Sequence, residues 1–241
     1  DIKNVPKLLI RVLELNTYSY YKNFMKPIEP NINIDGLVPQ KEIQVEYTQS
    51  SFVRHQEFFR FDELKAGAFV IEFIGNGRDS RVIVKKGTLK FVSKLTVSGH
   101  LFMVLDENNQ VCKGPGSGLY LDGRFYSTHN ENGIVMVPYC VESRYKNLVV
   151  TDGVISELCS GFEHLSENYT LETAFLVHEE QLLVGNPTTI GIKPKLFLNG
   201  VPAPSSLLVN PSAEIISTND EGTSSSKTFS NLPSTEMIPL A

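Results

Sequence analysis

The stretch LKAGAFVIEFIGNGRDSRVIVKKG, residues 64–87, decides the fold class of this chain. Two apolar segments flank Gly75-Asn76-Gly77, and the surroundings favour a second strand over a helix after the turn. Asn and Gly tolerate the left-handed backbone that tight hairpin turns require. The stretch therefore predicts a β-hairpin, and because no third glycine follows, it does not fit a dinucleotide-binding fingerprint.

The same kind of pattern extends along the chain. Apolar and polar residues alternate in Ile32-Asn33-Ile34 and in residues 43–47, which is typical of half-buried strands. Turn signals ending in glycine recur at Asp35-Gly36, Asn76-Gly77, Lys86-Gly87, Asp122-Gly123, Asn132-Gly133, Asp152-Gly153, Asn199-Gly200 and Glu221-Gly222. Many short strands joined by such turns predict an all-β sandwich or barrel. Only residues 5–16 and 156–167 are expected to form helices.

Length and composition indicate several small modules. The 241 residues exceed the needs of one small sandwich, and a hydrophobic content of 41% supplies enough apolar surface to fold. We expect an all-β chain of two or three consecutive antiparallel β-sandwich modules, with blocks at residues 1–92, 93–163 and 164–241. In the last block, the Ser/Thr-rich tract 217–230 is expected to form an exposed hairpin, because alternation resumes at Lys227-Thr228-Phe229.

Charge argues against nucleic acid as a partner. The net charge is −5, whereas binding to a phosphate backbone needs clustered Lys and Arg. One sparse basic cluster is interpreted as solvated strand and turn charge; its members are Arg78, Arg81, Lys85, Lys86 and Lys90. The longest apolar stretch, residues 67–74, is interrupted by Glu72 and is far shorter than the roughly 20 residues of a membrane-spanning helix. We expect no membrane-spanning segment.

The three cysteines, Cys112, Cys140 and Cys159, are too far apart for a C-x-x-C motif, and no histidine lies at zinc-ligand spacing. They are consistent with one disulfide and a free thiol, with three buried thiols, or with a bridge to a region outside this chain. Asn168-Tyr169-Thr170 is an N-glycosylation acceptor pattern, which makes Asn168 a candidate glycosylation site, although a single such pattern also occurs by chance in many cytosolic proteins.

A search for catalytic and cofactor motifs assigns no residue. Gly114-Pro115-Gly116-Ser117-Gly118 fits neither a phosphate loop nor a nucleophile elbow and is interpreted as a connection between strands. The acidic loops at residues 106–108 and 219–221 lack calcium-loop spacing. The histidines are isolated from one another in sequence and lie beside no obvious nucleophile; they are His55, His100, His129, His164 and His178. We therefore predict no catalytic, cofactor-binding or metal residues.

The middle of the chain resembles a known family pattern. Residues 99–109 (GHLFMVLDENN), 118–123 (GLYLDG) and 132–138 (NGIVMVP) resemble the transthyretin-like pattern of carboxypeptidase-regulatory and related surface modules. In the flanking blocks, residues 64–70 and 219–223 resemble strands and hairpins of macroglobulin-type sandwiches. These resemblances imply immunoglobulin-like or macroglobulin-like modules. The C-G-E-Q thioester motif is absent from the sequence, so covalent trapping is not implied.

The sequence predicts a non-enzymatic structural or interaction segment, which binds protein partners or neighbouring domains. Because Asp1-Ile2-Lys3 includes no initiator Met or signal-peptide pattern, we expect a piece of a longer modular protein. Its expected location is secreted or on the cell surface, with a cytoplasmic location as the alternative. The alternative function is an accessory ligand- or carbohydrate-binding region of a larger enzyme, with sugars stacked on Tyr18, Tyr20, Tyr21 and Phe24.

Overall fold

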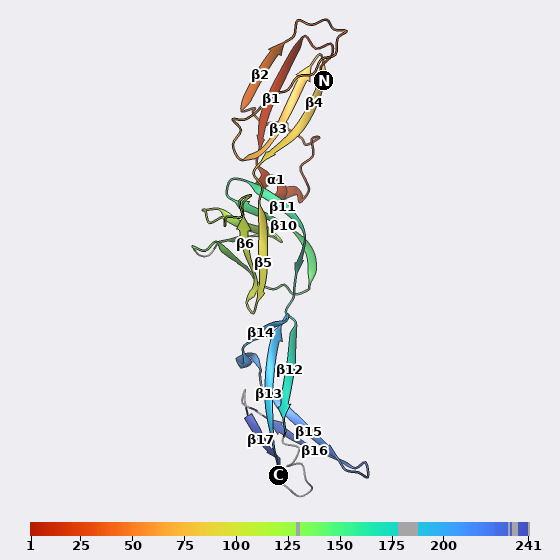
Figure 1. Ribbon diagram of the computed structural model, residues 1–241, viewed down its shortest axis with the longest axis vertical. Coiled ribbons are helices and arrows are strands. Elements are labelled where there is room, and N and C mark those ends of the chain that lie inside the picture. Colours follow the sequence, from red (N-terminus) through yellow and green to blue (C-terminus); the bar gives the residue numbers. More distant parts are fainter. Residues whose placement is uncertain (129–130, 178–187, 231, 233–235, 241) are drawn as a thin grey trace. The chain divides into compact units, whose positions relative to one another are not determined.

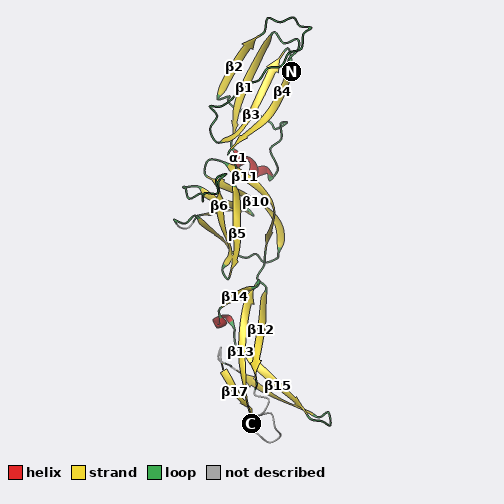
Figure 2. Cartoon of the chain, viewed as in Figure 1, coloured by secondary structure: helices red, strands yellow, loops and turns green. Residues whose placement is uncertain are grey.

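The computed structural model describes residues 1–128, 131–177, 188–230, 232 and 236–240. Regular structure in these residues is mainly β (Figure 2), with one α-helix, α1 (Thr17–Phe24), and one short 3-10 helix, Ser205–Leu207. The chain divides into two compact units. Unit 1 comprises Asp1–Lys94, His100–Pro138 and Glu142–Leu165, and unit 2 comprises Leu95–Gly99, Tyr139–Val141 and Ser166–Ala241.

Unit 1 begins with a four-stranded antiparallel sheet, called the first sheet (Figure 1). Its strands, in the order β2-β1-β3-β4, are β2 (Lys41–Glu46), β1 (Lys7–Leu15), β3 (Gly67–Gly75) and β4 (Arg78–Lys86). The central strand β1 is buried on both faces, because Ile10 and Val12 pack into one apolar cluster and Leu13 into another. The turn between β3 and β4 confirms the predicted hairpin, with φ of 48° at Asn76 and 70° at Gly77.

The prediction of a helix at residues 5–16 is wrong, because β1 occupies most of this segment. A strand that is buried on both faces has an almost continuous apolar run, and its spacing imitates that of a helix. The true helix α1 begins one residue after the expected one ends. Asn16 caps it, accepting a hydrogen bond from the Ser19 N–H at 2.8 Å.

Two facing sheets, almost all of whose residues belong to unit 1, form the second sandwich. One sheet has the order β11-β10-β7-β8, with β11 (Ser156–His164), β10 (Arg144–Asp152), β7 (Ser117–Leu121) and β8 (Arg124–Ser127). The other has the order β5-β6-β9, with β5 (Lys90–Thr96), β6 (Gly99–Leu105) and β9 (Ile134–Val137). Fully buried side chains from both sheets, including Phe102, Leu119 and Leu148, share one core.

The prediction of a helix at residues 156–167 is also wrong, since β11 occupies most of this segment. Phe162 pairs with Lys146 and Cys159 with Leu148, so β11 has one more residue than β10 between these pairs. Gly161 lies in this interval with φ of 76°. Such a bulge interrupts the period of two and leaves apolar residues at a helix-like spacing.

Unit 2 is likewise built from antiparallel strands. β13 (Thr188–Leu198) pairs with β12 (Tyr169–Leu176), β14 (Val201–Ala203) and β17 (Glu236–Leu240), and β15 (Ser212–Thr218) pairs with β16 (Ser224–Ser230). The β15–β16 hairpin confirms the prediction for the tract 217–230. The all-β class is confirmed, whereas the block boundaries at 1–92, 93–163 and 164–241 stay a prediction.

Candidate functional site

The predicted cysteine positions lie in the described residues, and no disulfide joins them. Cys112 and Cys159 pack against the core of the second sandwich. Burial, followed by the nearby Glu157 carboxylate, raises the pKa of the Cys159 thiol to about 11. Burial also raises the pKa of Cys112. A thiol held protonated in this way is a poor nucleophile.

Two of the histidines lie next to each other. The rings of His100 and His164 are 5.6 Å apart, and both side chains are buried. His100 Nε2 accepts from the Leu165 N–H at 3.3 Å, and His164 Nε2 lies 2.9 Å from the Pro138 carbonyl oxygen. These contacts make the pair part of the backbone hydrogen bonding of unit 1. His129 and His178 lie outside the described residues.

The loop and acidic residues considered for catalysis or calcium have local structural roles. Ser117 is buried, and its hydroxyl donates to the Asp152 carbonyl oxygen at 3.2 Å. Asp106 accepts from the N–H groups of Asn108 and Gln110, and Asn219 caps its own turn in the same way. No group of three or more His, Cys, Asp or Glu within the described residues is placed to hold a metal ion.

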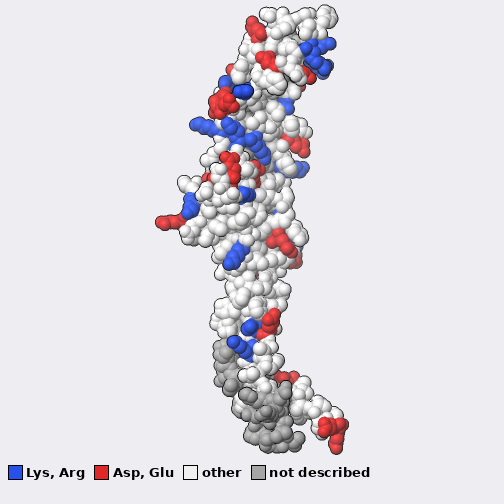
Figure 3. Space-filling model, viewed as in Figure 1, with Lys and Arg blue, Asp and Glu red and all other residues white. Residues whose placement is uncertain are grey.

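Three members of the predicted basic cluster, all on β4, make local contacts. Arg81 forms an ion pair with Glu72 at 2.9 Å, Lys85 with Glu157 at 3.0 Å, and Lys86 donates to a backbone carbonyl at 3.2 Å. On the face that Figure 3 shows, basic and acidic side chains lie interspersed. Arg81, Lys85 and Lys86 are therefore held in local contacts.

Helix α1 connects the two parts of unit 1. Although it follows β1 of the first sheet, it packs against β10 and β11 of the second sandwich (Figure 1). Thr17 accepts a hydrogen bond from the Ser156 N–H at 3.0 Å, and both residues are buried. We call the contacts of α1 and β4 with the second sandwich the α1 joint.

A charged side chain completes the α1 joint. Lys85 on β4 donates to the Tyr21 hydroxyl at 2.8 Å and pairs with Glu157 on β11 at 3.0 Å. Burial alone would lower the pKa of Lys85, but the hydrogen bonds that Lys85 donates to Tyr21 and Glu157, together with the Glu157 charge, outweigh burial and raise it. Lys85 therefore stays charged while linking three elements.

The aromatic residues considered for sugar stacking belong largely to the same joint. Tyr21 is 1% exposed, and the Tyr18 ring makes edge contacts with Tyr120 and Phe125 at centroid distances of 6.3 and 6.0 Å. Phe24 is exposed and packs beside Tyr20. The four rings do not form one open platform, because Tyr21 is covered. The capping residue Asn16 is the sequence signal that would have located α1.

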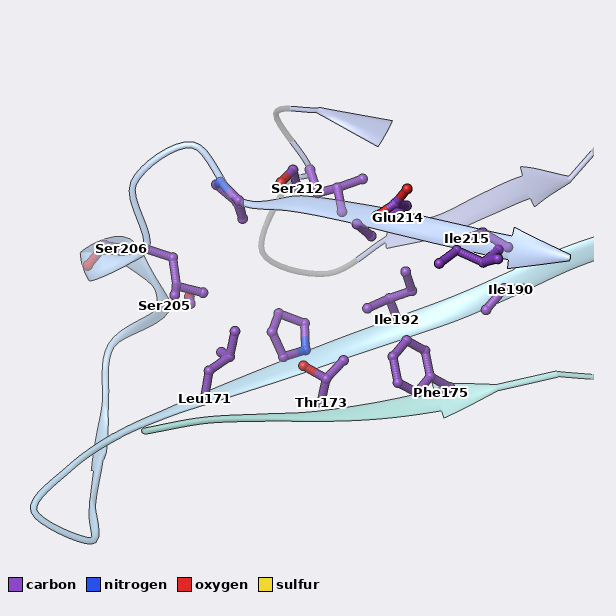
Figure 4. Close-up of a pocket in the computed structure, with 16 residues that line it drawn as sticks. Leu171, Thr173, Phe175, Ile190, Ile192, Ser205, Ser206, Ser212, Glu214 and Ile215 are labelled. Atoms are coloured by element: carbon purple, nitrogen blue, oxygen red, sulfur yellow. The ribbon is translucent and has the colours of Figure 1, made fainter. Parts of the chain in front are cut away.

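Unit 2 contains an apolar pocket of about 690 Å³. In Figure 4 the side chains of Leu171 and Phe175 from β12 and Ile192 from β13 lie opposite Ile215 from β15. Phe175 remains 66% exposed, so much of this apolar surface is open to solvent. An apolar group that entered the pocket would cover this exposed surface.

Asn168 is exposed immediately before β12, where its carbonyl oxygen accepts from the Asn199 N–H at 2.9 Å. Its glycosylation stays a prediction. Within the described part of the chain, no helix is long and apolar enough to cross a membrane.

The fold defines a class of protein: a run of consecutive all-β modules of the immunoglobulin-like kind. Two family models match the chain, the AbpF first immunoglobulin-like domain over residues 8–87 and the AbpF third immunoglobulin-like domain over residues 178–239. The immunoglobulin-like class is therefore supported, whereas neither match is to a macroglobulin or transthyretin-like module.

One curated relative is similar to almost the whole length of the chain. The chain is 33% identical over 226 residues to "Actin-binding protein F" of Dictyostelium discoideum. The match covers 91% of this chain but only 9% of that relative. No solved structure matches the chain.

Proposed function

We propose that this chain is a non-enzymatic interaction segment of an actin-associated modular protein, and that unit 1 works as one interaction body. The observation that carries the proposal is the similarity to Actin-binding protein F over 91% of the chain. Immunoglobulin-like modules commonly present their strand faces and loops to other proteins, which suits this role.

The structural roles of the reactive side chains support a non-enzymatic function. The thiol of Cys159 is held protonated, and the Ser117 hydroxyl is used in a backbone contact. His100 and His164 are buried in contact with backbone groups. These four side chains are therefore engaged in structural contacts.

The α1 joint supports the idea of one body. Domains within a chain move relative to one another unless the interface between them is well packed. Here a buried hydrogen bond and a charged bridge join the first sheet, α1 and the second sandwich. Surfaces on both parts would then be offered to a partner in one fixed arrangement.

Co-sedimentation with filamentous actin tests the proposed partner. We expect the 241-residue chain to pellet with actin in a fraction that rises and saturates as actin increases, while it stays in the supernatant without actin. A chain that stays in the supernatant at every actin concentration would contradict direct actin binding.

The proposed association with actin favours the cytoplasmic alternative over a secreted or cell-surface location. The similarity to this relative does not support the expected secreted location. The carbohydrate-binding alternative is disfavoured because Tyr21 is buried in the α1 joint. A glycan array is expected to show no binding.

A further inference from the structure

A groove beside the α1 joint has the chemistry of a side-chain receptor. It measures about 620 Å³ and is lined by the end of β1, the start of α1, and strand and loop residues of the second sandwich. Its lining includes Gly116 and Gly153, whose φ angles are 93° and 94°. A Cβ on Gly153 would lie 2.8 Å from the Pro115 carbonyl oxygen, so this backbone arrangement requires glycine there.

Two aromatic rings form a corner in this groove. Tyr18 and Phe125 both line it, with ring centroids 6.0 Å apart and planes at 85°. Phe125 is 38% exposed, so part of its surface is available to a ligand. The same aromatic cluster already attracts a cation of the chain, because the Lys22 Nζ lies 5.5 Å from the Tyr120 ring centroid.

The groove carries a negative charge. Glu14 is the one charged residue among the ten that line it. Its carboxylate accepts a hydrogen bond from Gln40, and no described Lys, Arg or His forms an ion pair with it. A cation entering the groove would therefore meet an available carboxylate oxygen.

A buried hydroxyl adds a further hydrogen-bonding group. Ser156 lines the groove and is 3% exposed, and its Oγ has no hydrogen-bond partner among the described residues. Buried hydroxyls usually have a partner, and an unpaired one marks a position where a ligand or water can bind.

We infer that this groove binds an arginine side chain of a partner protein. A guanidinium group is planar and stacks on aromatic rings, and it carries five N–H donors, whereas an ammonium group is a compact, strongly hydrated charge. Phe125 and Tyr18 supply the rings, and Glu14 supplies the opposite charge. The inference does not depend on actin being that partner.

The test is a titration of the 241-residue chain with an acetylated and amidated Leu-Arg-Leu peptide, followed by amide chemical shifts. We expect the amide signals of Gly116 and Gly153 to shift. Matched peptides with Lys or Gln in place of Arg should bind more weakly, with the affinity falling from Arg to Lys to Gln. Glu14→Gln and Phe125→Ala should each lower the affinity for the Arg peptide about two- to fivefold.

Matched controls separate the groove from general surface effects. Asp79→Asn and Phe58→Ala change an exposed acid and an exposed ring outside the groove, and they should leave the affinity unchanged. Because Phe125 also contacts the α1 joint, the exposed Glu14 provides the decisive variant. Equal binding of the three peptides, or full Arg-peptide affinity in Glu14→Gln, would overturn the inference.

Discussion

At the scale of single residues, the buried histidine pair makes the stability of unit 1 depend on pH. Burial, and then the neighbouring His164, lower the pKa of His100 from 6.5 to about 4. The unfolded chain therefore binds more protons than the folded chain between these two values. The contribution of His100 to the free energy of unfolding should be complete above pH 6.5. The free energy of unfolding should then fall by roughly 2–3 kcal/mol as the pH drops to about 4.

Urea unfolding at a series of pH values measures this loss, and a substitution isolates its source. His100→Gln keeps a hydrogen-bond acceptor for the Leu165 N–H but does not titrate. The variant should show a clearly shallower decline below pH 6.5. An unchanged slope would show that His100 is not the responsible group.

Some residue-scale features are predictable from sequence and others are not. The turn at Asn76-Gly77 follows from local backbone preference, because both residues tolerate positive φ. The pairing of His100 with His164 depends on strands β6 and β11 meeting in three dimensions, and no local pattern encodes that. The aromatic corner of Tyr18 and Phe125 is a long-range juxtaposition of the same kind.

At the scale of elements, α1 should stabilise unit 1 through one buried hydrogen bond. Thr17→Val keeps the shape of the side chain but removes the acceptor for the Ser156 N–H. A buried donor left without a partner costs about 1–3 kcal/mol, so the free energy of unfolding should fall by about that amount. Thermal or urea unfolding measures the change.

Thr48→Val is the matched control, because Thr48 is exposed and lies outside the α1 joint. It should change the free energy of unfolding by less than about 0.5 kcal/mol. Equal losses in the two variants would mean that the effect comes from the threonine substitution itself and not from the joint.

Element types were predictable where local signals were strong, as for the β3–β4 hairpin, but the alternation at residues 32–34 does not form a strand. β2 was anticipated from its alternation, whereas β1 and β11 were mistaken for helices. In β1 both faces are buried, and in β11 a bulge at Gly161 shifts the apolar residues. In each case tertiary packing, which the sequence pattern does not show, determines the spacing.

At the scale of the whole molecule, the proposed function requires unit 1 to behave as one interaction body. The all-β class was recoverable from turn spacing and alternation, but the α1 joint was not. Lys85 and Glu157 are distant in sequence, and their ion pair forms only when β4 and β11 come together. The proposed actin partner also lay beyond the sequence pattern, and its proposal rests on similarity to a relative.

Amide relaxation by NMR reports how fast each part of the chain tumbles, and it tests whether unit 1 is one body. We predict one correlation time for the first sheet, residues 7–86, and for β10 and β11 of the second sandwich, because the α1 joint links them. Two clearly different correlation times would contradict the claim and would make the first sheet and the second sandwich independent modules.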